Sequence, residues 1–361
     1  MRKVVLGDVV KINPAMKVAK GQLVKFISMD KLDPFTKTPN GYEKKKFSSG
    51  TKFANGDTLL ARITPCLENG KTAFVDFLDD SEVAAGSTEF VILRNIKGLT
   101  DPAYIYYLSI SPAFRDYAIK SMVGTSGRQR VQNDVLAKME LSLPPLYQQK
   151  KIADILSSLD EKIELNRRMN ETLEQLGQAL FRHYFIDKAR QSNSNVETVP
   201  LGKKFHPKRG RSLQARDMIH GNVPVVSGGL KPAGFHNEAN TTAPVITISA
   251  SGANAGFVSV WGEPVWSADS SYIDSTITKY VYTYYLFLKN KQKEIYNMQT
   301  GSGQPHIYPN HIELLEIADL SDCEFNDFEQ RVRPLFDMIH KNKKQIDYLS
   351  NIRDLLLPKL V

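Results

Sequence analysis

The stretch LYQQKKIADILSSLDEKIELNRRMNETLEQLGQALFRHY, which runs from Leu146 to Tyr184, decides how this chain folds. Its apolar residues recur at steps of three and four, the spacing that puts them on one face of a helix. Pro144 and Pro145 stand just before it, where a fixed φ suits the approach to a helix start. The sequence therefore predicts a long amphipathic helix with one sharply defined apolar face.

This apolar face, called the seam below, needs a partner, and the chain supplies one. The seam of the first helix consists of Ile152, Leu156, Leu159, Ile163, Asn166 and Leu173. A second helical stretch begins near Glu324, and its seam consists of Phe328, Val332, Leu335, Ile339, Asn342 and Leu349. Each residue of the second seam stands 176 positions after its counterpart, Asn342 after Asn166 included. Because a seam Asn can fix the register of a coiled coil, the two helices are expected to pair, in antiparallel fashion.

The same offset continues upstream of the helices, since Ile312 follows Leu136 and Ile317 follows Leu141 by 176 positions. The chain is thus one unit written twice, an internal repeat with approximate two-fold symmetry. The expected fold class is α+β, with two globular domains joined by two long helices. The expected boundaries are 1–143 for the first globular domain, 144–187 for the first long helix, 188–320 for the second globular domain and 321–361 for the second long helix.

Short β-type runs alternate with turn signals in both globular parts. Predicted strands lie at Leu23–Ile27, Asp57–Ile63, Thr72–Val75 and Thr88–Leu93, and then at Pro224–Val226, Pro244–Ser249 and Gly256–Val260. A tyrosine-rich helical segment occurs in each part, at Tyr104–Leu108 and at Tyr282–Leu286. Residues 188–198 are polar and are expected to form a linker.

Composition narrows the class of protein. The 361 residues carry a formal net charge of +8 and a sequence pI of about 9.2, which favours a polyanionic partner such as nucleic acid. Cys66 and Cys323 are isolated, which indicates a reducing compartment without a disulfide or zinc framework. The sequence contains neither a signal-peptide core nor an apolar run of membrane-spanning length, so we expect a cytoplasmic protein with no membrane partner.

The chain lacks the common sequence motifs of catalysis. It has no phosphate-binding loop, no dinucleotide fingerprint and no His or Cys spacing typical of a metal site. An adenine methyltransferase would need an Asn/Asp-Pro-Pro-aromatic motif, and Asn13-Pro14-Ala15-Met16 is not one. The sequence thus predicts no catalytic residue, no cofactor-binding residue and no metal ligand.

Polar loops with basic residues suit DNA instead, because Arg and Lys contact phosphates or guanine while Asn and Gln can read adenine. The candidate DNA-binding residues of the first domain are Arg62, Thr64, Lys71, Ser126, Arg128, Gln129 and Arg130. Those of the second domain are Lys208, Arg209, Arg211, Ser227, Ser251, Asn254, Gln304 and His306. Each loop alone is also what an ordinary solvated surface looks like. Their recurrence at matched positions in two domains favours a binding role.

The chain resembles the specificity subunit of a type I restriction-modification system over essentially its full length. The residues that carry the resemblance are Leu143–Gln149 before the first helix, Leu159–Ile163 within it, Phe181–Phe185 at its end, and Val226–Gly229 and Ile248–Val258 in the second domain. The second helix departs from the family pattern, since Ser321–Glu324 stands where the Pro-Pro entry would be.

The resemblance implies two target recognition domains that each read one half of a split double-stranded DNA target. It implies a coiled coil that sets the spacer and docks two methyltransferase (modification) subunits, with restriction subunits where the system has them. S-adenosylmethionine, ATP and Mg²⁺ would then belong to those partners and none to this chain. Apolar residues outside the seam, namely Ile155, Leu165, Phe181, Tyr184 and Phe185, are expected to need cover from the partners.

Two alternatives stay open at this point. One is a recognition fragment of a self-contained DNA methyltransferase, which uptake of labelled S-adenosylmethionine by the isolated chain would favour. The other is a non-catalytic coiled-coil scaffold with two protein-binding domains, which protein binding without salt-sensitive DNA binding would favour.

Overall fold

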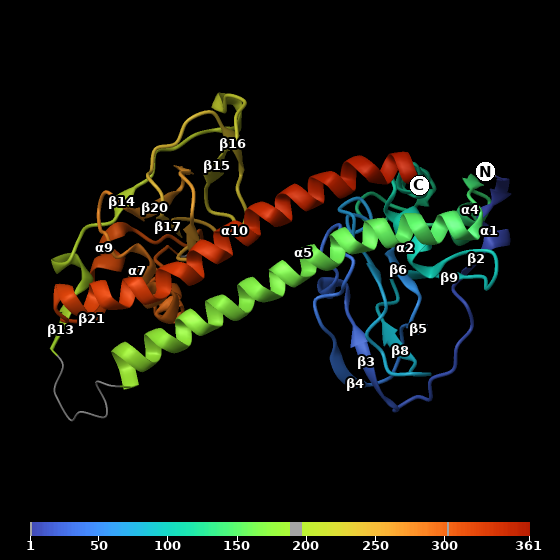
Figure 1. Ribbon diagram of the computed structural model, residues 1–361, viewed down its shortest axis with the longest axis horizontal. Helices are drawn as coiled ribbons and strands as arrows, with labels where there is room; N and C mark the ends of the chain where they lie inside the picture. The colour runs from blue at the N-terminus through green and yellow to red at the C-terminus, as the bar shows by residue number, and fades with distance from the viewer. Residues whose placement is uncertain (1, 188–196, 302) are drawn as a thin grey trace. The chain divides into compact units, whose positions relative to one another are not determined.

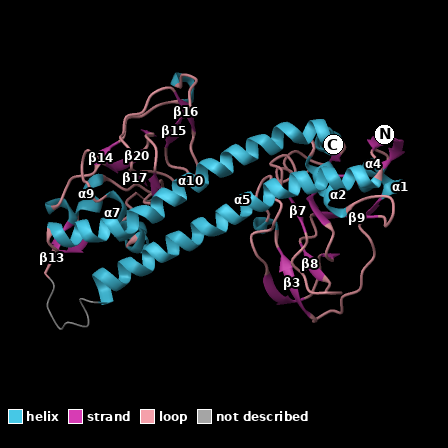
Figure 2. Cartoon of the chain, in the orientation of Figure 1, coloured by secondary structure: helices cyan, strands magenta, loops and turns pink. Residues whose placement is uncertain are grey.

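The computed structural model describes residues 2–187, 197–301 and 303–361, and it contains both helices and strands throughout (Figure 2). The expected α+β class is therefore confirmed. The chain divides into two compact units, unit 1 with residues 1–166 and 345–361 and unit 2 with residues 167–344. The division falls inside both long helices, so each unit contains a part of each helix. Of the expected linker, residues 188–196 lie outside the described residues.

Unit 1 contains two four-stranded sheets and two short ribbons (Figure 1). The first sheet has the order β2 (Val10–Ile12), β9 (Phe90–Asn95), β6 (Thr58–Ala61) and β7 (Thr72–Phe74). The second has the order β4 (Glu43–Lys46), β3 (Leu23–Ile27), β8 (Ala84–Gly86) and β5 (Thr51–Phe53). The ribbons pair β1 (Arg2–Val5) with β12 (Glu140–Leu143) and β10 (Met122–Val123) with β11 (Arg130–Val131). The short helices are α1 (Leu6–Val9), η1 (Met29–Lys31), α2 (Pro102–Ile110), α3 (Pro112–Lys120) and α4 (Asn133–Ala137).

Unit 2 follows the same plan with fewer strands. One sheet has the order β14 (Lys208–Arg209), β20 (Ser270–Asp274), β17 (Val245–Ser249) and β18 (Val258–Trp261). The other has the order β16 (Gly234–His236), β15 (Val223–Val226) and β19 (Trp266–Ser267), and a ribbon pairs β13 (Thr198–Pro200) with β21 (Glu316–Ala318). The short helices are η3 (Leu201–Lys203), η4 (Ala215–Asp217), α7 (Val281–Asn290), α8 (Gln292–Asn297) and α9 (Pro309–Glu313).

The two units repeat one topology. In unit 1, β6 pairs antiparallel with both β7 and β9; in unit 2, β17 pairs antiparallel with both β18 and β20. Each unit opens on a strand that pairs with the strand just before its long helix. Even a glycine is repeated: a Cβ on Gly7 would lie 3.2 Å from the backbone of Ala137, and a Cβ on Gly202 would lie 3.1 Å from Cβ of Glu313. The structure thus confirms the internal repeat.

The long helices are α5 (Leu146–Phe181), which continues as a π-helical stretch, η2 (Arg182–Asp187), and α10 (Asp322–Leu360). Within unit 1 they run antiparallel, because early α5 meets late α10: Asn166 Nδ2 donates to Gln345 Oε1 at 2.9 Å. Within unit 2, Asn342 Nδ2 donates to Asn170 Oδ1 at 2.9 Å. The matched seam residues Asn166 and Asn342 therefore each have a partner in their own unit and are not bonded to each other.

The seam residues lie inward. Leu156, Ile163, Asn166, Phe328, Val332, Ile339 and Asn342 are buried, and Ile152, Leu159, Leu173, Leu335 and Leu349 are half-buried. The expectation that Phe181 and Phe185 point outward is wrong. Both are buried in the core of unit 2, where their rings contact Phe328 at centroid distances of 6.0 and 4.9 Å. Three-and-four spacing does not show which face of a helix end a neighbouring domain covers. Within the described part of the chain, we find no helix that is apolar over a bilayer's thickness.

Candidate nucleic-acid interface

The loop after strand β6 and the hairpin β10–β11 come together in unit 1. Thr64 N donates to Gln129 O at 3.0 Å, and Val131 N donates to Arg62 O at 2.9 Å. The hairpin turn needs Gly127 at φ +76°, a conformation that other residues rarely adopt. These bonds bring most of the basic and polar residues predicted for this unit onto one edge of the first sheet.

A carboxylate and a guanidinium lie at the centre of this edge. Arg130 donates from Nη2 to Glu89 Oε1 at 2.7 Å and from Nε to Glu89 Oε2 at 2.9 Å, a fork that fixes the plane of the guanidinium. These hydrogen bonds, together with the charge of Arg130, hold the pKa of Glu89 below its usual value. The Arg130 side chain is still 42% exposed, so it can be approached from solvent.

The other predicted residues of unit 1 differ in how free they are. Arg62 donates from Nη2 to Val131 O at 2.9 Å, and Lys71 donates from Nζ to Met29 O at 3.0 Å, so both brace the loops. Thr64 Oγ1 lies 3.4 Å from Glu68 Oε1. Ser126 and Arg128 are exposed at the hairpin tip, and Gln129 is half-buried. Arg128 is therefore the more accessible of the two predicted hairpin arginines.

Unit 2 builds the same arrangement from different side chains. Asp269 accepts a hydrogen bond from Arg209 Nη2 at 2.8 Å and a short one from the Ser251 hydroxyl. Ser251 follows strand β17, and its backbone bridges to His306. Gly228 lies so close that a Cβ there would be 2.7 Å from Ser251 O, which explains a glycine beside Ser227.

The remaining predicted residues of unit 2 surround this centre. Lys208 and Arg209 form strand β14, and Arg211 lies over the Trp266 ring at 5.9 Å. His306 stacks on Tyr308 at a centroid distance of 5.9 Å, and Gln304 beside it is exposed. Asn254 O accepts from Phe257 N at 2.9 Å, closing the turn after Ser251. Ser227 is half-buried.

The two centres occupy equivalent backbone positions. Arg62 N donates to Glu89 O, and Ala250 N donates to Asp269 O; Val131 N donates to Arg62 O, and Ile307 N donates to Ala250 O. Glu89 and Asp269 each precede the strand next to the central one, β9 or β20. Sequence reasoning missed both carboxylates because it searched for basic and amide groups. The signal was present, since each carboxylate directly precedes a strand that sequence or repeat marks.

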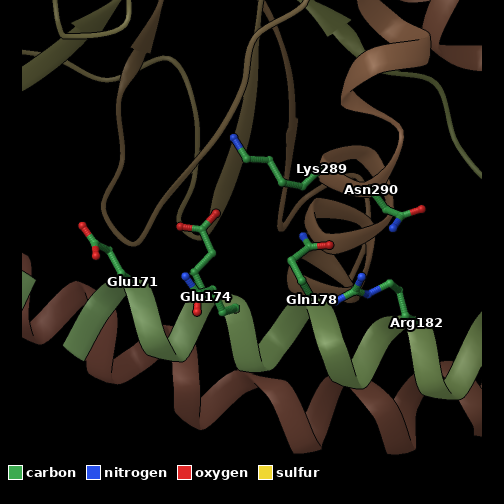
Figure 3. Close-up of a pocket in the computed structure, with 7 residues that line it drawn as sticks. Glu171, Glu174, Gln178, Arg182, Lys289 and Asn290 are labelled. Atoms are coloured by element: carbon green, nitrogen blue, oxygen red, sulfur yellow. The ribbon is translucent and has the colours of Figure 1, made fainter. Parts of the chain in front are cut away.

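A polar hollow of about 540 Å³ lies elsewhere in unit 2, between α5 and the end of α7 (Figure 3). Glu174 accepts from the Tyr285 hydroxyl at 2.6 Å, and Lys289 donates from Nζ to Val258 O at 3.2 Å. Burial lowers the pKa of Lys289. No predicted DNA-binding residue lines this hollow. Across residues 2–187, 197–301 and 303–361, no three His, Cys, Asp or Glu side chains are grouped as metal ligands would be.

The fold and these duplicated loops define a class: a two-unit α+β protein with one polar, guanidinium-bearing loop cluster in each unit. The family model described as type I restriction modification DNA specificity domain matches residues 1–175. This part of the chain belongs to that family, and the resemblance to type I specificity subunits is confirmed.

Individual relatives agree with the family match. The chain is 35% identical to the HindI specificity subunit of Haemophilus influenzae over 133 residues, which are 37% of this chain and 28% of that protein. It is 27% identical to the MjaIX specificity subunit of Methanocaldococcus jannaschii over 293 residues, 72% of this chain and 68% of that protein. The chain thus spans under a third of the first relative's length.

A solved structure shares the fold. The type I restriction-modification S subunit from M. genitalium superposes with a TM-score of 0.63 at 20% identity, over 99% of this chain and 95% of that one. At this identity the likeness speaks for the fold of the whole described chain.

Proposed function

We propose that this chain is the DNA-recognition subunit of a type I restriction-modification complex, in which each unit reads one half of a bipartite target. The observation that carries the proposal is the pair of equivalent centres, Glu89 with Arg130 and Asp269 with Arg209. A guanidinium held in plane by a carboxylate is oriented for the two acceptors of a guanine edge. The flanking Ser, Thr and Gln side chains suit phosphate and sugar contacts, which set register without sequence information.

The two units use different side chains on one backbone frame, and this supports two different half-sites. Arg130 is on strand β11, whereas Arg209 is on strand β14 at the other side of its sheet. The guanidinium therefore reaches the carboxylate from opposite sides in the two units. A bipartite target with unlike halves is the expected consequence.

The test is the methylation motif in cells that carry the chain with its modification subunit. Arg130→Ala should relax or abolish reading of one half-site only, and Arg209→Ala should affect only the other. One good base contact is worth about 1–3 kcal/mol of discrimination. Lys138→Ala, an exposed basic residue of unit 1 outside the loop cluster, is the matched control. If both arginine variants keep the parental motif and level, these loops do not read DNA. DNA binding that is absent or insensitive to salt would favour a protein scaffold instead.

Partner docking is the second part of the proposal. Tyr147, Ile155 and Leu165 on helix α5 are 60%, 50% and 53% exposed, which is unusual for large apolar side chains grouped on one helix. We propose that two modification subunits cover such surfaces and bring S-adenosylmethionine, and that restriction subunits bring ATP and Mg²⁺. This chain would supply no catalytic residue, and the complex would act in the cytoplasm. Native mass measurement of the purified complex checks the stoichiometry.

The helices are proposed to set the spacer between half-sites. Helix α5 has 36 residues, which at about 1.5 Å each is about 54 Å. One heptad inserted after Asn166 and one after Lys344, where the units divide, keeps the bonds of Asn166 and Asn342 and adds about 10 Å. The spacer should grow by about 3 base pairs while both half-sites stay unchanged. An unchanged spacer in an active complex would mean that something else sets the distance.

A further inference from the structure

A buried ion pair joins the two long helices in unit 1. Arg353 Nη1 on α10 donates to Asp160 Oδ1 on α5 at 2.8 Å, and the two side chains are 5% and 4% exposed. The Tyr107 hydroxyl donates to the other carboxylate oxygen at 2.8 Å. Arg353 also donates to Phe35 O at 3.0 Å. Both charges are therefore paired, and both depend on partners that lie within this unit.

The equivalent place in unit 2 is apolar and has no room. Phe336 stands 176 residues after Asp160, and Gly177 stands 176 residues before Arg353. The Phe336 ring stacks on Tyr282 at a centroid distance of 4.6 Å and reaches within 3.9 Å of the point where Gly177 would carry a Cβ. That Cβ would also lie 3.2 Å from Cδ2 of the buried Leu286. Only a glycine lets the helices approach here.

We infer that these two pairs of residues make the halves of this chain, 1–187 and 197–361, pair with each other and reject a second copy of themselves. The repeated seams otherwise make α5 a fitting partner for the α5 of another copy. In such a pair, Asp160 would face Gly177 of the copy and lose its guanidinium. An unpaired buried charge weakens association by about 10²–10³-fold, and a symmetric pair contains it twice.

Self-pairing of the second half meets the opposite obstacle. In an α10–α10 pair, Arg353 of one copy would take the place of Gly177 against Phe336 of the other. The contacts of Gly177 leave no space even for a Cβ without a shift of Leu286, and a guanidinium there would lack a carboxylate. One half is thus excluded by an unpaired charge and the other by size and charge. This inference does not depend on DNA recognition.

The test uses the full chain with a protease site placed within 188–196 and cut after folding, so that the halves are held only by their contacts. Two batches whose first halves differ in mass are mixed, incubated and weighed by native mass spectrometry. The parent should give only first-half–second-half pairs. Asp160→Phe removes the unpaired charge and gives the first half a Phe opposite Gly177, as in unit 2. First-half–first-half pairs should then appear, and pairing with the second half should weaken about 10²-fold.

Two further variants make every outcome decisive. Asp160→Phe with Arg353→Gly should restore pairing between unlike halves, which also shows that the Phe is tolerated. Asp154→Phe, on an exposed position of the same helix, should behave as the parent. Statistical mixing of parental halves would overturn the inference. So would the absence of like pairs in Asp160→Phe when the double variant pairs normally.

Discussion

Units 1 and 2 start the same helix in different ways. In unit 1, α2 is capped locally, because the Asp101 side chain accepts from Tyr104 N at 3.0 Å. In unit 2, the cap of α7 comes from α10: Glu329 accepts from Thr283 N at 2.9 Å and from the Thr283 hydroxyl at 2.8 Å. Position 329 corresponds to Ala153 in the first helix, which can cap nothing. A repeated backbone thus keeps a requirement, the unpaired amides of a helix start, and leaves its solution free.

The same holds at the ion pair of Asp160 with Arg353 and at the loop centres. In each case the backbone positions match and the side chains have exchanged roles. The difference teaches that the repeat conserves where a group is needed rather than which group supplies it. The predictions below break or sharpen this comparison, from the largest expected effect to the smallest.

Arg353→Leu should be the most damaging change in unit 1. It leaves Asp160 charged, buried and without its guanidinium, at a cost of about 3–5 kcal/mol in the free energy of unfolding. Asp160→Leu with Arg353→Leu should recover most of the loss, since an apolar pair resembles Phe336 against Gly177 in unit 2 and Tyr107 keeps Ser157 at 3.3 Å. Urea unfolding measures both. A double variant as unstable as the single one would show that the charges are not the reason.

Removing each cap compares the two helix starts directly. Glu329→Ala leaves several buried donors of α7 unpaired and should cost about 2–4 kcal/mol. Asp101→Ala removes a single local cap and should cost about 1 kcal/mol. Asp101→Asn is the control, because Asn caps as well as Asp. Equal losses for the two alanine variants would contradict the view that unit 2 depends on a tertiary cap.

The cap of unit 2 should also respond to pH. Burial raises the pKa of Glu329 above 4.5, although its hydrogen bonds with Thr283 and the charge of Arg333 oppose this. The folded state then holds the proton more tightly than the unfolded state does. The corresponding stability is present below about pH 4.5 and is lost as pH rises through the folded pKa. Relative to Glu329→Gln, which cannot ionise, the parent should lose stability between pH 4 and 7. A difference that does not change with pH would refute this.

The loop centres should give the smallest stability effect. Glu89→Gln weakens the ion pair with Arg130, whose side chain is 42% exposed, so the loss should be below about 1 kcal/mol. Recognition should nevertheless change in the half-site of unit 1 and not in the other. Asp269→Asn should give the mirror result. Loss of both half-sites from either variant would indicate a general folding defect, which urea unfolding would reveal.

Local pattern carried most of the fold. The three-and-four spacing specified α5 and α10, alternation and turns specified β3, β6, β7 and β17, and the offset of 176 residues specified the repeat. These features depend on which residues share a face, and sequence distance alone determines that. Short strands such as β5, β10 and β14 were not predicted, because two or three residues hold no periodic signal.

The site was half visible in the sequence. Arg130, Arg209 and Ser251 were singled out as basic or hydroxyl groups in loops, but the carboxylates that hold them were not. Glu89 lies 41 residues from Arg130, and Asp269 lies 60 residues from Arg209. The sequence by itself determined the repeat, the paired helices and the loops that bear function. Only the tertiary structure decided that Asp160 meets Arg353 and that Glu329 caps α7, because those contacts join positions far apart in the chain and depend on side-chain packing rather than on local spacing.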